Sequence, residues 1–432
     1  MKKINVGLIG LGTVGVGVVK ILRDRKTLLS EKIGVEINIK KICDKDITTK
    51  RKVTLDKNIL TRNANDILND PGIDIVVELI GGIHPAKDFI VEALNKGKNI
   101  VTANKALLSQ EGKELFAHAI ERGKNIYFEA SVGAGIPIIK SLREGLVANR
   151  FNSVFGIVNG TSNFVLTEMS VNNRSFADAL AQAKLKGFAE KDPTLDIEGI
   201  DSAHKLILLA HLCFGKFVDI KDIFIEGISR VSLADVNYAK ELGFVIKLLA
   251  IAKKENQELE LRVHPTLIPQ DHLLASVGGV CNAIYVSSDL AGELLFYGPG
   301  AGQLSAASAV VSDLVDLTQD IKAGLFRPTL KATQDQSLKK LRAIDDIKSR
   351  YYIRFMTEDK PGVLANISGV LAKYGISIAS VTQKEKRKGA KVVPIVMVIH
   401  EAKEKSLRQA MSIIDRLNII KEKAVAIRIE EV

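Results

Sequence analysis

The sequence contains no tryptophan, and phenylalanine and tyrosine bring the aromatic content to only 5%. This scarcity bears on the formal net charge of +11, which by itself could indicate binding to nucleic acid. Nucleic-acid-binding proteins often combine basic side chains with aromatic residues that stack on bases, and no such motif occurs here. Small anionic molecules account for the charge equally well, so we expect no nucleic-acid partner.

Cysteine is also scarce. Cys43, Cys213 and Cys281 lie far apart and form no Cys-x-x-Cys pair, which suits a reducing compartment and not a disulfide framework. Lys2 and Lys3 precede an apolar run, as in a signal peptide, but glycines interrupt that run and no small-residue cleavage site follows. No uncharged run has the length of a membrane span. We therefore expect a soluble, cytoplasmic protein with no membrane partner.

The length of 432 residues suggests two to four domains, and the first of them has a dinucleotide-binding pattern. A short apolar strand, Ile4 to Ile9, runs into a glycine-rich turn and then an amphipathic helix. The turn has the spacing GxGxxG and consists of Gly10-Leu11-Gly12-Thr13-Val14-Gly15. In this context the glycines allow a tight turn, close approach of a pyrophosphate and packing of the helix on the strand. A plain strand-turn-helix without a ligand is the alternative.

Strands and helices keep alternating to about residue 130, which predicts a parallel sheet covered by helices on both faces. We expect strands at 35–42, 73–80, 100–103 and 126–129, and helices at 85–95 and 111–122. Ligands bind at the carboxyl ends of the strands in such sheets. Asn104 and Lys105 follow a strand end, so Lys105 is a candidate site residue, with an exposed structural lysine as the alternative.

The residues around the second strand give conflicting indications about the cofactor. Asp44 follows that strand, where an acidic residue suits a ribose hydroxyl of NAD(H). Basic residues that could neutralise the 2′-phosphate of NADP(H) lie on both sides of it, namely Lys40, Lys41, Lys50, Arg51 and Lys52. We favour NADP(H) and keep NAD(H) as the alternative.

Acidic and basic side chains crowd the stretch 183–205. Glycine and an Asp-Pro pair disfavour helix, which predicts a loop up to Gly199 and then an apolar helix. Asp201 and Lys205 are four residues apart on that helix and share one face. An ion pair on a solvated helix is the plain interpretation. An acidic loop leading into a lysine-bearing helix would also hold a small cationic substrate beside a proton donor.

The region between these two features contains a glycine-rich bend at 129–137. Its carbonyls and the carboxylate of Glu129 suit a hard cation, with a plain domain crossover as the alternative. A strand at 151–158 ends in the polar turn Asn159–Asn163, which could bind a carboxylate or cap a helix. Strands expected at 244–253, 258–265, 282–287 and 293–297 predict an α+β domain with a mainly antiparallel sheet, which could pair across a dimer. A glycine-rich turn at 298–302 then opens a helix of small residues.

The segment from Tyr351 to Val432 predicts the order βαββαβ, the ferredoxin-like plan. The charged stretch 331–350 before it is expected to be a linker. The turn Asp359-Lys360-Pro361-Gly362 opens the first helix, and its free amides can hold an α-carboxylate. Asp359 could bind an ammonium group or merely cap the helix. The basic segment 384–388, with Lys391, is expected to be a solvated hairpin turn.

These patterns together resemble the homoserine dehydrogenase family with a C-terminal ACT domain. The resemblance rests on the GxGxxG motif, the stretch 183–205, the glycine turn 298–302 and the Asp-x-Pro-Gly-Val-Leu turn. The signature in the acidic stretch consists of Ala183, Gly187, Phe188, Ala189, Asp192, Pro193, Asp196, Ile197, Gly199, Asp201 and Lys205. Phe188 departs from the family, which often has tyrosine there, so any role of a phenol hydroxyl is lost or moved.

The resemblance implies reversible hydride transfer between a nicotinamide cofactor and L-aspartate 4-semialdehyde, giving L-homoserine, in threonine and methionine biosynthesis. It implies catalytic roles for Lys205, as the proton donor, and for Lys105. The implied substrate-binding residues are Glu190, Asp196, Asp201 and Thr161. The implied cofactor-binding residues are Gly10, Gly12, Thr13, Val14, Gly15, Lys105, Gly187 and Gly302. A monovalent cation, expected to be Na⁺, is implied at Glu129 and the backbones of Val132, Ala134 and Ile136, where the family often has glycine in place of Ala134.

The resemblance also implies a domain plan and an assembly. We expect a Rossmann-type dinucleotide-binding domain at 1–133 and 302–328, a substrate-binding and dimerisation domain at 134–301, a linker at 329–350 and an ACT regulatory domain at 351–432. The chain is expected to form a homo-oligomer, a dimer or tetramer, regulated by an amino-acid effector such as L-threonine. The alternatives are another amino-acid dehydrogenase with an ACT tail and a non-catalytic amino-acid sensor. A sensor would have no reason to keep the charged site residues together.

Overall fold

The structure, a computed structural model, describes residues 2–51, 53–328, 338–384 and 392–431. It divides into two compact units. The first consists of Met1–Val154, Ala203–Lys221 and Cys281–Gln336, and the second of Phe155–Ser202, Asp222–Val280 and Ser337–Val432. Within the described ranges, no helix is both long enough and apolar enough to cross a membrane.

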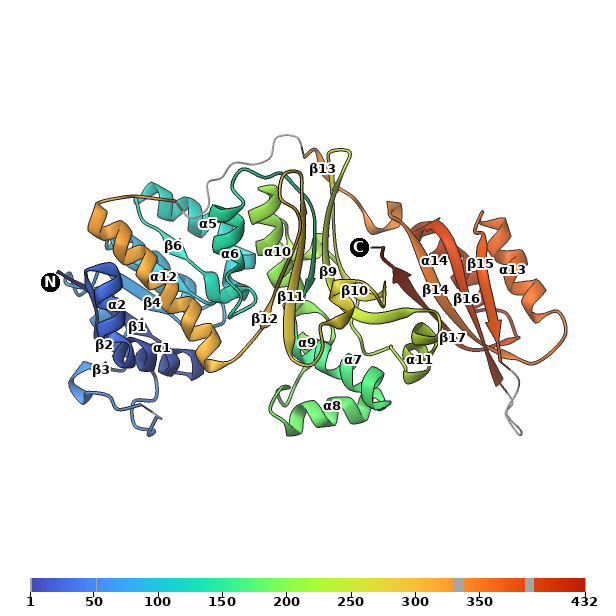
Figure 1. Cartoon of the computed structure of the whole chain (residues 1–432), viewed down its shortest axis with the longest axis horizontal. Coiled ribbons are helices and arrows are strands. Elements are labelled where there is room, and N and C mark those ends of the chain that lie inside the picture. Colours follow the sequence, from blue (N-terminus) through green and yellow to red (C-terminus); the bar gives the residue numbers. More distant parts are fainter. Residues whose placement is uncertain (1, 52, 329–337, 385–391, 432) are drawn as a thin grey trace. The chain divides into compact units, whose positions relative to one another are not determined.

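A parallel sheet of six strands forms the centre of the first unit (Figure 1). Its strands are β1 (Lys3–Ile9), β2 (Glu36–Cys43), β3 (Leu60–Thr61), β4 (Ile75–Glu78), β5 (Asn99–Thr102) and β6 (Ile126–Tyr127). Their spatial order is β3-β2-β1-β4-β5-β6, and all neighbours are parallel. This is the predicted Rossmann-type sheet. The order reverses between β1 and β4, where such sheets bind their ligands.

Helices cover this sheet, and one of them comes from much later in the chain. They are α1 (Thr13–Asp24), α2 (Lys26–Ile33), α3 (Asn65–Leu68), α4 (Ala86–Asn95), α5 (Lys105–Glu121) and α12 (Gln303–Ala323). A Cβ atom on Gly17 would lie 2.7 Å from the carbonyl oxygen of Gln303 and 2.8 Å from the Cβ of Ala307. Glycine therefore lets α1 and α12 approach closely, and both helices contribute side chains to one hydrophobic core.

Shorter elements complete the first unit. Strand β11 (Cys281–Ser288) pairs antiparallel with β12 (Gly292–Pro299), with Ile284 opposite Phe296. Helix α6 (Ile138–Lys140) follows the glycine-rich bend, and helix α10 (Ile200–Phe214) begins in the second unit and continues in the first.

Two of the four antiparallel strands predicted for the middle region lie in the second unit, and the other two are β11 and β12 of the first. Strands β9 (Phe244–Glu255) and β10 (Glu258–Pro269) pair along their whole length. Asn256 and Gln257 join them with φ values of +49° and +69°, a turn that matches the twist of a hairpin. Other elements in this part of the chain are β7 (Phe151–Ile157), α7 (Gly160–Asn172), α8 (Phe176–Leu185), α9 (Thr194–Ile197), β8 (Phe224–Ile225), α11 (Leu233–Glu241) and β13 (Lys340–Leu341).

The C-terminal segment has the predicted βαββαβ order. It consists of β14 (Lys348–Glu358), α13 (Val363–Lys373), β15 (Ile378–Gln383), β16 (Val392–Lys403), α14 (Glu404–Ile414) and β17 (Ile420–Ile429). The strands pair antiparallel in the order β17-β14-β16-β15, over a core of apolar side chains from both helices. Strand β17 also pairs parallel with β10, through Thr266 opposite Arg428 and Leu267 opposite Ile429. The β9–β10 hairpin and the C-terminal strands thus form one continuous sheet.

A buried ion pair joins this sheet to α11. The guanidinium of Arg354, on β14, donates to both carboxylate oxygens of Asp235 at 2.6 and 3.1 Å, and the hydroxyl of Tyr352 donates to the same carboxylate at 2.9 Å. Asp235 is fully buried and also forms a capping box with Ser232 at the start of α11. One carboxylate therefore both starts a helix and holds it to the C-terminal sheet.

Local structure differs from the sequence-based expectation in three places. Helix α5 starts at Lys105 and not at residue 111, because the side chain of Asn104 accepts a hydrogen bond from the Leu107 amide at 3.2 Å. The loop expected up to Gly199 contains the short helix α9. Strand β13 and the first residues of β14 lie inside the stretch expected to be a linker. The predicted basic hairpin falls almost wholly at 385–391, outside the described residues.

The Asp235–Arg354 pair predicts a large stability effect. Replacing Arg354 with methionine should lower the free energy of unfolding by about 3–5 kcal/mol, because a fully buried carboxylate would lose its countercharge. Urea denaturation measures this loss. Lys384→Ala is the matched control, since Lys384 pairs with Glu241 where both side chains are about half exposed, and it should change stability by less than about 0.5 kcal/mol. Equal losses in the two variants would contradict the prediction.

Candidate active site

The turn between β1 and α1 forms a glycine-rich cradle. Gly10 has a φ of +105°, which favours glycine, and its N–H donates to the carbonyl oxygen of Cys43 at 2.8 Å. A Cβ atom on Gly15 would lie only 2.2 Å from the carbonyl oxygen of Gly10. The fold itself therefore requires both glycines.

Gly12 differs from its two neighbours in the motif. Its φ is −75°, and a Cβ atom there would meet no atom within 4 Å. No side chain of the described residues caps α1, whose first residues are Thr13 and Val14. The amides at this helix start thus face open space beside Gly12, which fits a pyrophosphate.

Asp44 and Arg51 both contact this turn. Asp44 accepts a hydrogen bond from the Leu11 amide at 2.5 Å and lies 3.4 Å from a guanidinium nitrogen of Arg51. Arg51 also donates from Nε to the Leu11 carbonyl at 2.8 Å. The acidic residue expected to bind a ribose hydroxyl is therefore already engaged with protein groups, and a half-buried arginine lies beside it.

The two lysines before Asp44 have partners away from the turn. Lys40 forms an ion pair with Asp70 at 2.9 Å, and Lys41 donates to the main-chain carbonyl of Asp66 at 3.3 Å. Lys52 lies outside the described residues.

Lys105 lies at the carboxyl edge of the sheet, because it is the first residue of α5, which follows the end of β5. Asn104, directly before it, donates to the carbonyl oxygen of Gly82 at 2.7 Å. The buried carboxylate of Glu78 at the end of β4 accepts from the hydroxyl of Thr102 at 2.7 Å. These contacts hold the loops after β4 and β5 together and fix the position of the Lys105 backbone.

Gly302 starts α12 near the same cradle. Its φ of +128° favours glycine, and the next residue, Gln303, donates from Nε2 to the carbonyl oxygen of Thr13 at 3.1 Å. The N-terminus of α12 therefore lies beside that of α1.

The carboxylate of Glu129 lies in the bend before α6. Its two oxygens accept the amides of Ile139 and Lys140 at 2.9 and 2.8 Å, and its own amide donates to Asp313 at 2.8 Å. Burial raises the pKa of Glu129, although the two amides oppose this shift. Burial also raises the pKa of Asp313 well above its usual value, and the charge of Glu129 adds to the effect. Two buried carboxyl groups thus lie close together.

The backbone around Glu129 bends sharply. Ala134 has a φ of +43°, an uncommon value for a residue with a side chain. The carbonyl of Ile136 accepts the Ile138 amide at 2.8 Å. In the described ranges, no three histidine, cysteine, aspartate or glutamate side chains are placed to hold a metal ion together, so a cation here would depend on backbone carbonyls such as that of Val132.

In the second unit, the side chain of Asn159 joins α7 to α9 and α10, the two helices of the acidic stretch. Its Nδ2 donates to Asp196 at 2.7 Å and to Asp201 at 2.9 Å, while its Oδ1 accepts the Ser162 amide at 2.8 Å and so caps α7. The hydroxyl of Ser162 donates to the Asp196 carbonyl at 2.8 Å. The two carboxylates are therefore held next to each other.

Thr161 fixes the loop before α9. Its hydroxyl donates to the carbonyl oxygen of Phe188 at 2.6 Å, and the Phe188 ring packs edge-on against Phe164 with centroids 5.1 Å apart. Phe188 thus has a packing role that needs no hydroxyl. Gly187 and Glu190 flank it and are exposed.

Asp201 and Lys205 lie one turn apart on α10, and both side chains are buried, with 8% of each residue exposed. The expectation of a solvated ion pair therefore does not hold for them. Burial of two charged side chains on one helix face indicates specific partners and is common where proton transfer occurs.

The sequence points to Asn159 and Arg51 only as members of a polar turn and of a basic group, and it does not identify Asp313. The polar turn 159–163 was a signal for the first, and the basic residues near Asp44 for the second. Asp313 lies within a helix of small residues and gave no local signal.

Comparison with known proteins agrees with this arrangement. Family models match three segments: "Homoserine dehydrogenase, NAD binding domain" at residues 10–129, "Homoserine dehydrogenase" at 137–315 and "ACT domain" at 351–418. A homoserine dehydrogenase of Bacillus subtilis is 40% identical over 100% of this chain and 99% of that protein. One from Neisseria gonorrhoeae is 42% identical over 100% of this chain and 99% of that protein.

Solved structures give the same result. The crystal structure of a homoserine dehydrogenase from Thiobacillus denitrificans has a TM-score of 0.92 and 42% identity, over 100% of this chain and 99% of that one. A hyperthermophilic archaeal homoserine dehydrogenase in complex with NADPH has a TM-score of 0.64 and 28% identity, over 75% of this chain and 100% of that one. Because the cradle, the acidic stretch and the full-length relatives agree, this chain belongs to the homoserine dehydrogenase family and is an NAD(P)-dependent oxidoreductase that interconverts L-aspartate 4-semialdehyde and L-homoserine.

Proposed function

We propose that Asp196 and Asp201, held together by Asn159, bind and orient the substrate, and that Lys205 supplies the proton. The observation that carries this proposal is the Asn159 amide, which donates to both carboxylates at 2.7 and 2.9 Å. Paired carboxylates in a fixed position suit the ammonium and hydroxyl groups of homoserine. Thr161 fixes the Phe188 backbone, and Glu190 extends the acidic surface on the same loop.

The reaction needs one hydride and one proton. The bound nicotinamide supplies or accepts the hydride. In the reductive direction, the ammonium group of Lys205 donates a proton to the aldehyde oxygen as the C4 carbon accepts the hydride, and in the oxidative direction the neutral amine removes the hydroxyl proton. Lys105, at the sheet edge where cofactors bind, orients the substrate oxygen and the nicotinamide.

We assign the cofactor to the β1–α1 cradle, with Gly10, Gly12, Thr13, Val14 and Gly15 at the pyrophosphate and Gly187 and Gly302 as further contacts. NADP(H) is favoured over NAD(H), because Asp44 is engaged with the Leu11 amide and Arg51 lies beside it. Arg51 also donates to the main-chain carbonyls of Thr49 and Asp46, so its guanidinium would turn from these contacts to bind a 2′-phosphate. The archaeal relative in complex with NADPH supports the same choice.

A monovalent cation, Na⁺, is assigned to Glu129 and the backbones of Val132, Ala134 and Ile136. Glu129 and Asp313 are buried carboxyl groups in contact, which supports a cation close by, and the backbone of the bend offers carbonyl oxygens as further ligands. The role of such an ion would be to order the bend.

The remaining assignments concern domains, assembly and regulation. We keep the domain plan of 1–133 with 302–328, 134–301 and 351–432, and propose a dimer or tetramer. The edge strand β12 supports an interface, because it is the last strand of its sheet and Tyr297 on it is 58% exposed. L-Threonine is the proposed effector of the ACT domain, where α13 follows Gly362 and no side chain of the described residues caps its first turn.

The assay that tests the reaction follows nicotinamide absorbance with L-homoserine, using NADP and NAD in parallel. Absence of turnover with both cofactors would contradict the assigned chemistry.

Lys205→Ala should lower turnover by roughly 10²–10⁴-fold while NADPH binding survives, because a positioned acid is lost and the cradle is untouched. Steady-state rates and NADPH titration measure the two effects. Lys113→Ala, at an exposed lysine on α5, is the control and should keep wild-type rates. If Lys205→Ala keeps more than about a tenth of the turnover, the proton donor is another group, and Lys105 is the next candidate.

Gly12→Val should fold normally and lose affinity for NADPH. Its Cβ has open space and its φ suits any residue, but the side chain would occupy the place of the pyrophosphate. Gly15→Val is the contrasting variant and should be destabilised, because its Cβ would overlap the Gly10 carbonyl. Unchanged affinity in a folded Gly12→Val protein would show that the motif is only structural.

Arg51→Ala should raise the KM for NADP by roughly 10- to 100-fold and leave that for NAD nearly unchanged, since a charge-assisted contact with a phosphate is worth about 1.5–3 kcal/mol. Lys50→Ala, at the exposed neighbouring position, is the control. Equal effects on both cofactors would place Arg51 in a purely structural role.

A further inference from the structure

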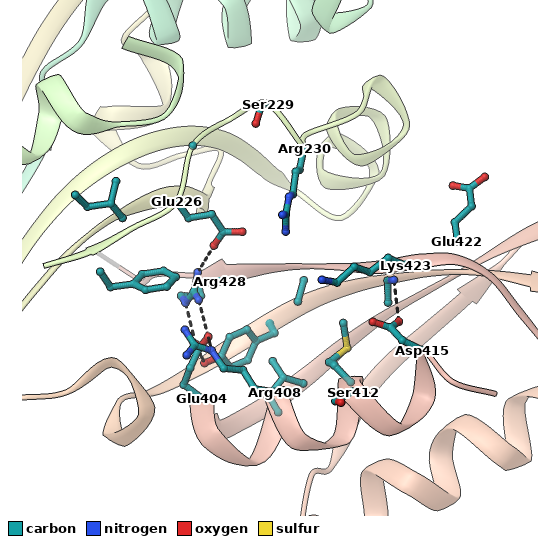
Figure 2. A pocket seen from close by; sticks show the side chains of 18 of the residues that line it. Glu226, Ser229, Arg230, Glu404, Arg408, Ser412, Asp415, Glu422, Lys423 and Arg428 are labelled. Atoms are coloured by element: carbon teal, nitrogen blue, oxygen red, sulfur yellow. Dashed lines mark hydrogen bonds and ion pairs between the residues drawn. The ribbon is translucent and has the colours of Figure 1, made fainter. Parts of the chain in front are cut away.

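A cleft of about 1100 Å³ lies inside the second unit, and residues 359–362 are not among those that line it. Its walls are α14, β17 and the segment from Phe224 to Arg230, which we call the 224–230 segment (Figure 2). Apolar side chains such as Leu407, Met411 and Ile420 contribute to its lining. Its size and mixed lining are those of a small-molecule site.

The floor of the cleft is an ion-pair network whose charges are already satisfied. Arg428 donates to both oxygens of Glu404 at 2.9 and 2.6 Å and to Glu226 at 3.0 Å. The hydroxyl of Tyr351 donates to Glu404 at 2.7 Å. Burial alone would raise the pKa of Glu404, but Arg428 holds it below its usual range. The network fastens the 224–230 segment to β17 through Glu226.

The positive charges at the mouth of the cleft, unlike those on its floor, are not paired with carboxylates of the described residues. Arg230, from the 224–230 segment, and Lys423, from β17, point toward each other across the opening, while Glu422 points away from both (Figure 2). Neither cation has a carboxylate partner in the described parts of the chain, although Lys421 beside them is paired with Glu358 at 2.5 Å. Two like charges that converge from separate elements are complementary to an anion between them.

We infer that this cleft is an effector site for a small organic anion, bound through carboxylate or phosphate oxygens by Arg230 and Lys423, and that its occupancy changes the affinity for homoserine. The second half of this inference rests on the proposed substrate role of Asp196 and Asp201. The site differs from the turn 359–362, because it uses the second helix and last strand of the ACT domain and a segment outside that domain.

The coupling follows from direct contacts between the cleft wall and the substrate loop. Glu198 and Ile200, on either side of Gly199, line the cleft themselves. The Ile228 amide donates to the carbonyl oxygen of Ile197 at 2.8 Å, and a Cβ atom on Gly227 would lie 2.5 Å from that oxygen. The 224–230 segment is thus packed against the end of α9, which carries Asp196. A ligand that draws Arg230 toward Lys423 displaces this segment and with it the substrate carboxylate.

The test uses the full chain and three probes: L-threonine, L-aspartate and inorganic phosphate. Calorimetric titration measures binding, and the KM for homoserine is measured with and without each probe. We expect at least one probe to bind and to change the KM by about 5- to 150-fold, the usual range of coupling between sites. Binding of an amino acid only would identify a carboxylate ligand, and binding of phosphate would identify a phosphate ligand.

The double variant Arg230→Ala/Lys423→Ala should lose the KM change and weaken probe binding at least tenfold, with unchanged rates in the absence of probe. Both positions are exposed, so folding should be preserved, and a thermal unfolding curve checks this. Lys405→Ala, an exposed cation elsewhere on α14, is the control and should keep the response. A full response in the double variant, or no binding by any probe, would overturn the inference.

The substrate role is checked separately by Asp196→Asn without a probe. An unchanged KM in that variant would reject the role of Asp196, while calorimetry on the wild-type chain and on the double variant still decides whether the cleft binds an anion.

Discussion

The side-chain amide of Asn159 is the contact on which the substrate side of this enzyme depends. Through its two N–H groups and one oxygen it joins the start of α7, the short helix α9 and the start of α10. Without it, two carboxylates would have no shared donor, and like charges would separate the elements that carry them. The amide holds both carboxylates next to each other, which is the arrangement that the proposed substrate role requires.

The cofactor side depends on a different constraint, which is close approach of main-chain atoms. Gly10 and Gly15 are required by the turn and Gly17 by the contact of α1 with α12, whereas Gly12 is free of any such requirement. The fold therefore explains three of these glycines and leaves Gly12 to the proposed contact with the cofactor.

Much of this could be predicted from the sequence, because local patterns determine it. The GxGxxG turn, the alternation of strands and helices, and the βαββαβ order are all readable from periodicity and turn residues. The start of α5 differs from the expectation because Asn104 caps the helix, which therefore begins at residue 105 and not at residue 111. Contacts such as Asn159 with Asp196, or Glu129 with Asp313, join residues far apart in the chain, and no local pattern encodes them.

The pairing of β17 with β10 has a consequence for how the protein is made. Strand β10 ends at residue 269, and the strand that covers its edge begins at residue 420. During synthesis, the ribosome must therefore add all the residues between them before β17 can pair with β10. Until then, only the short strands β8 and β13 can cover this edge of β10. Such exposed edges are where growing chains aggregate or recruit chaperones. The ACT domain thus also covers part of β10 and extends its sheet, and yield on expression should respond to changes in β17 even when the purified enzyme does not.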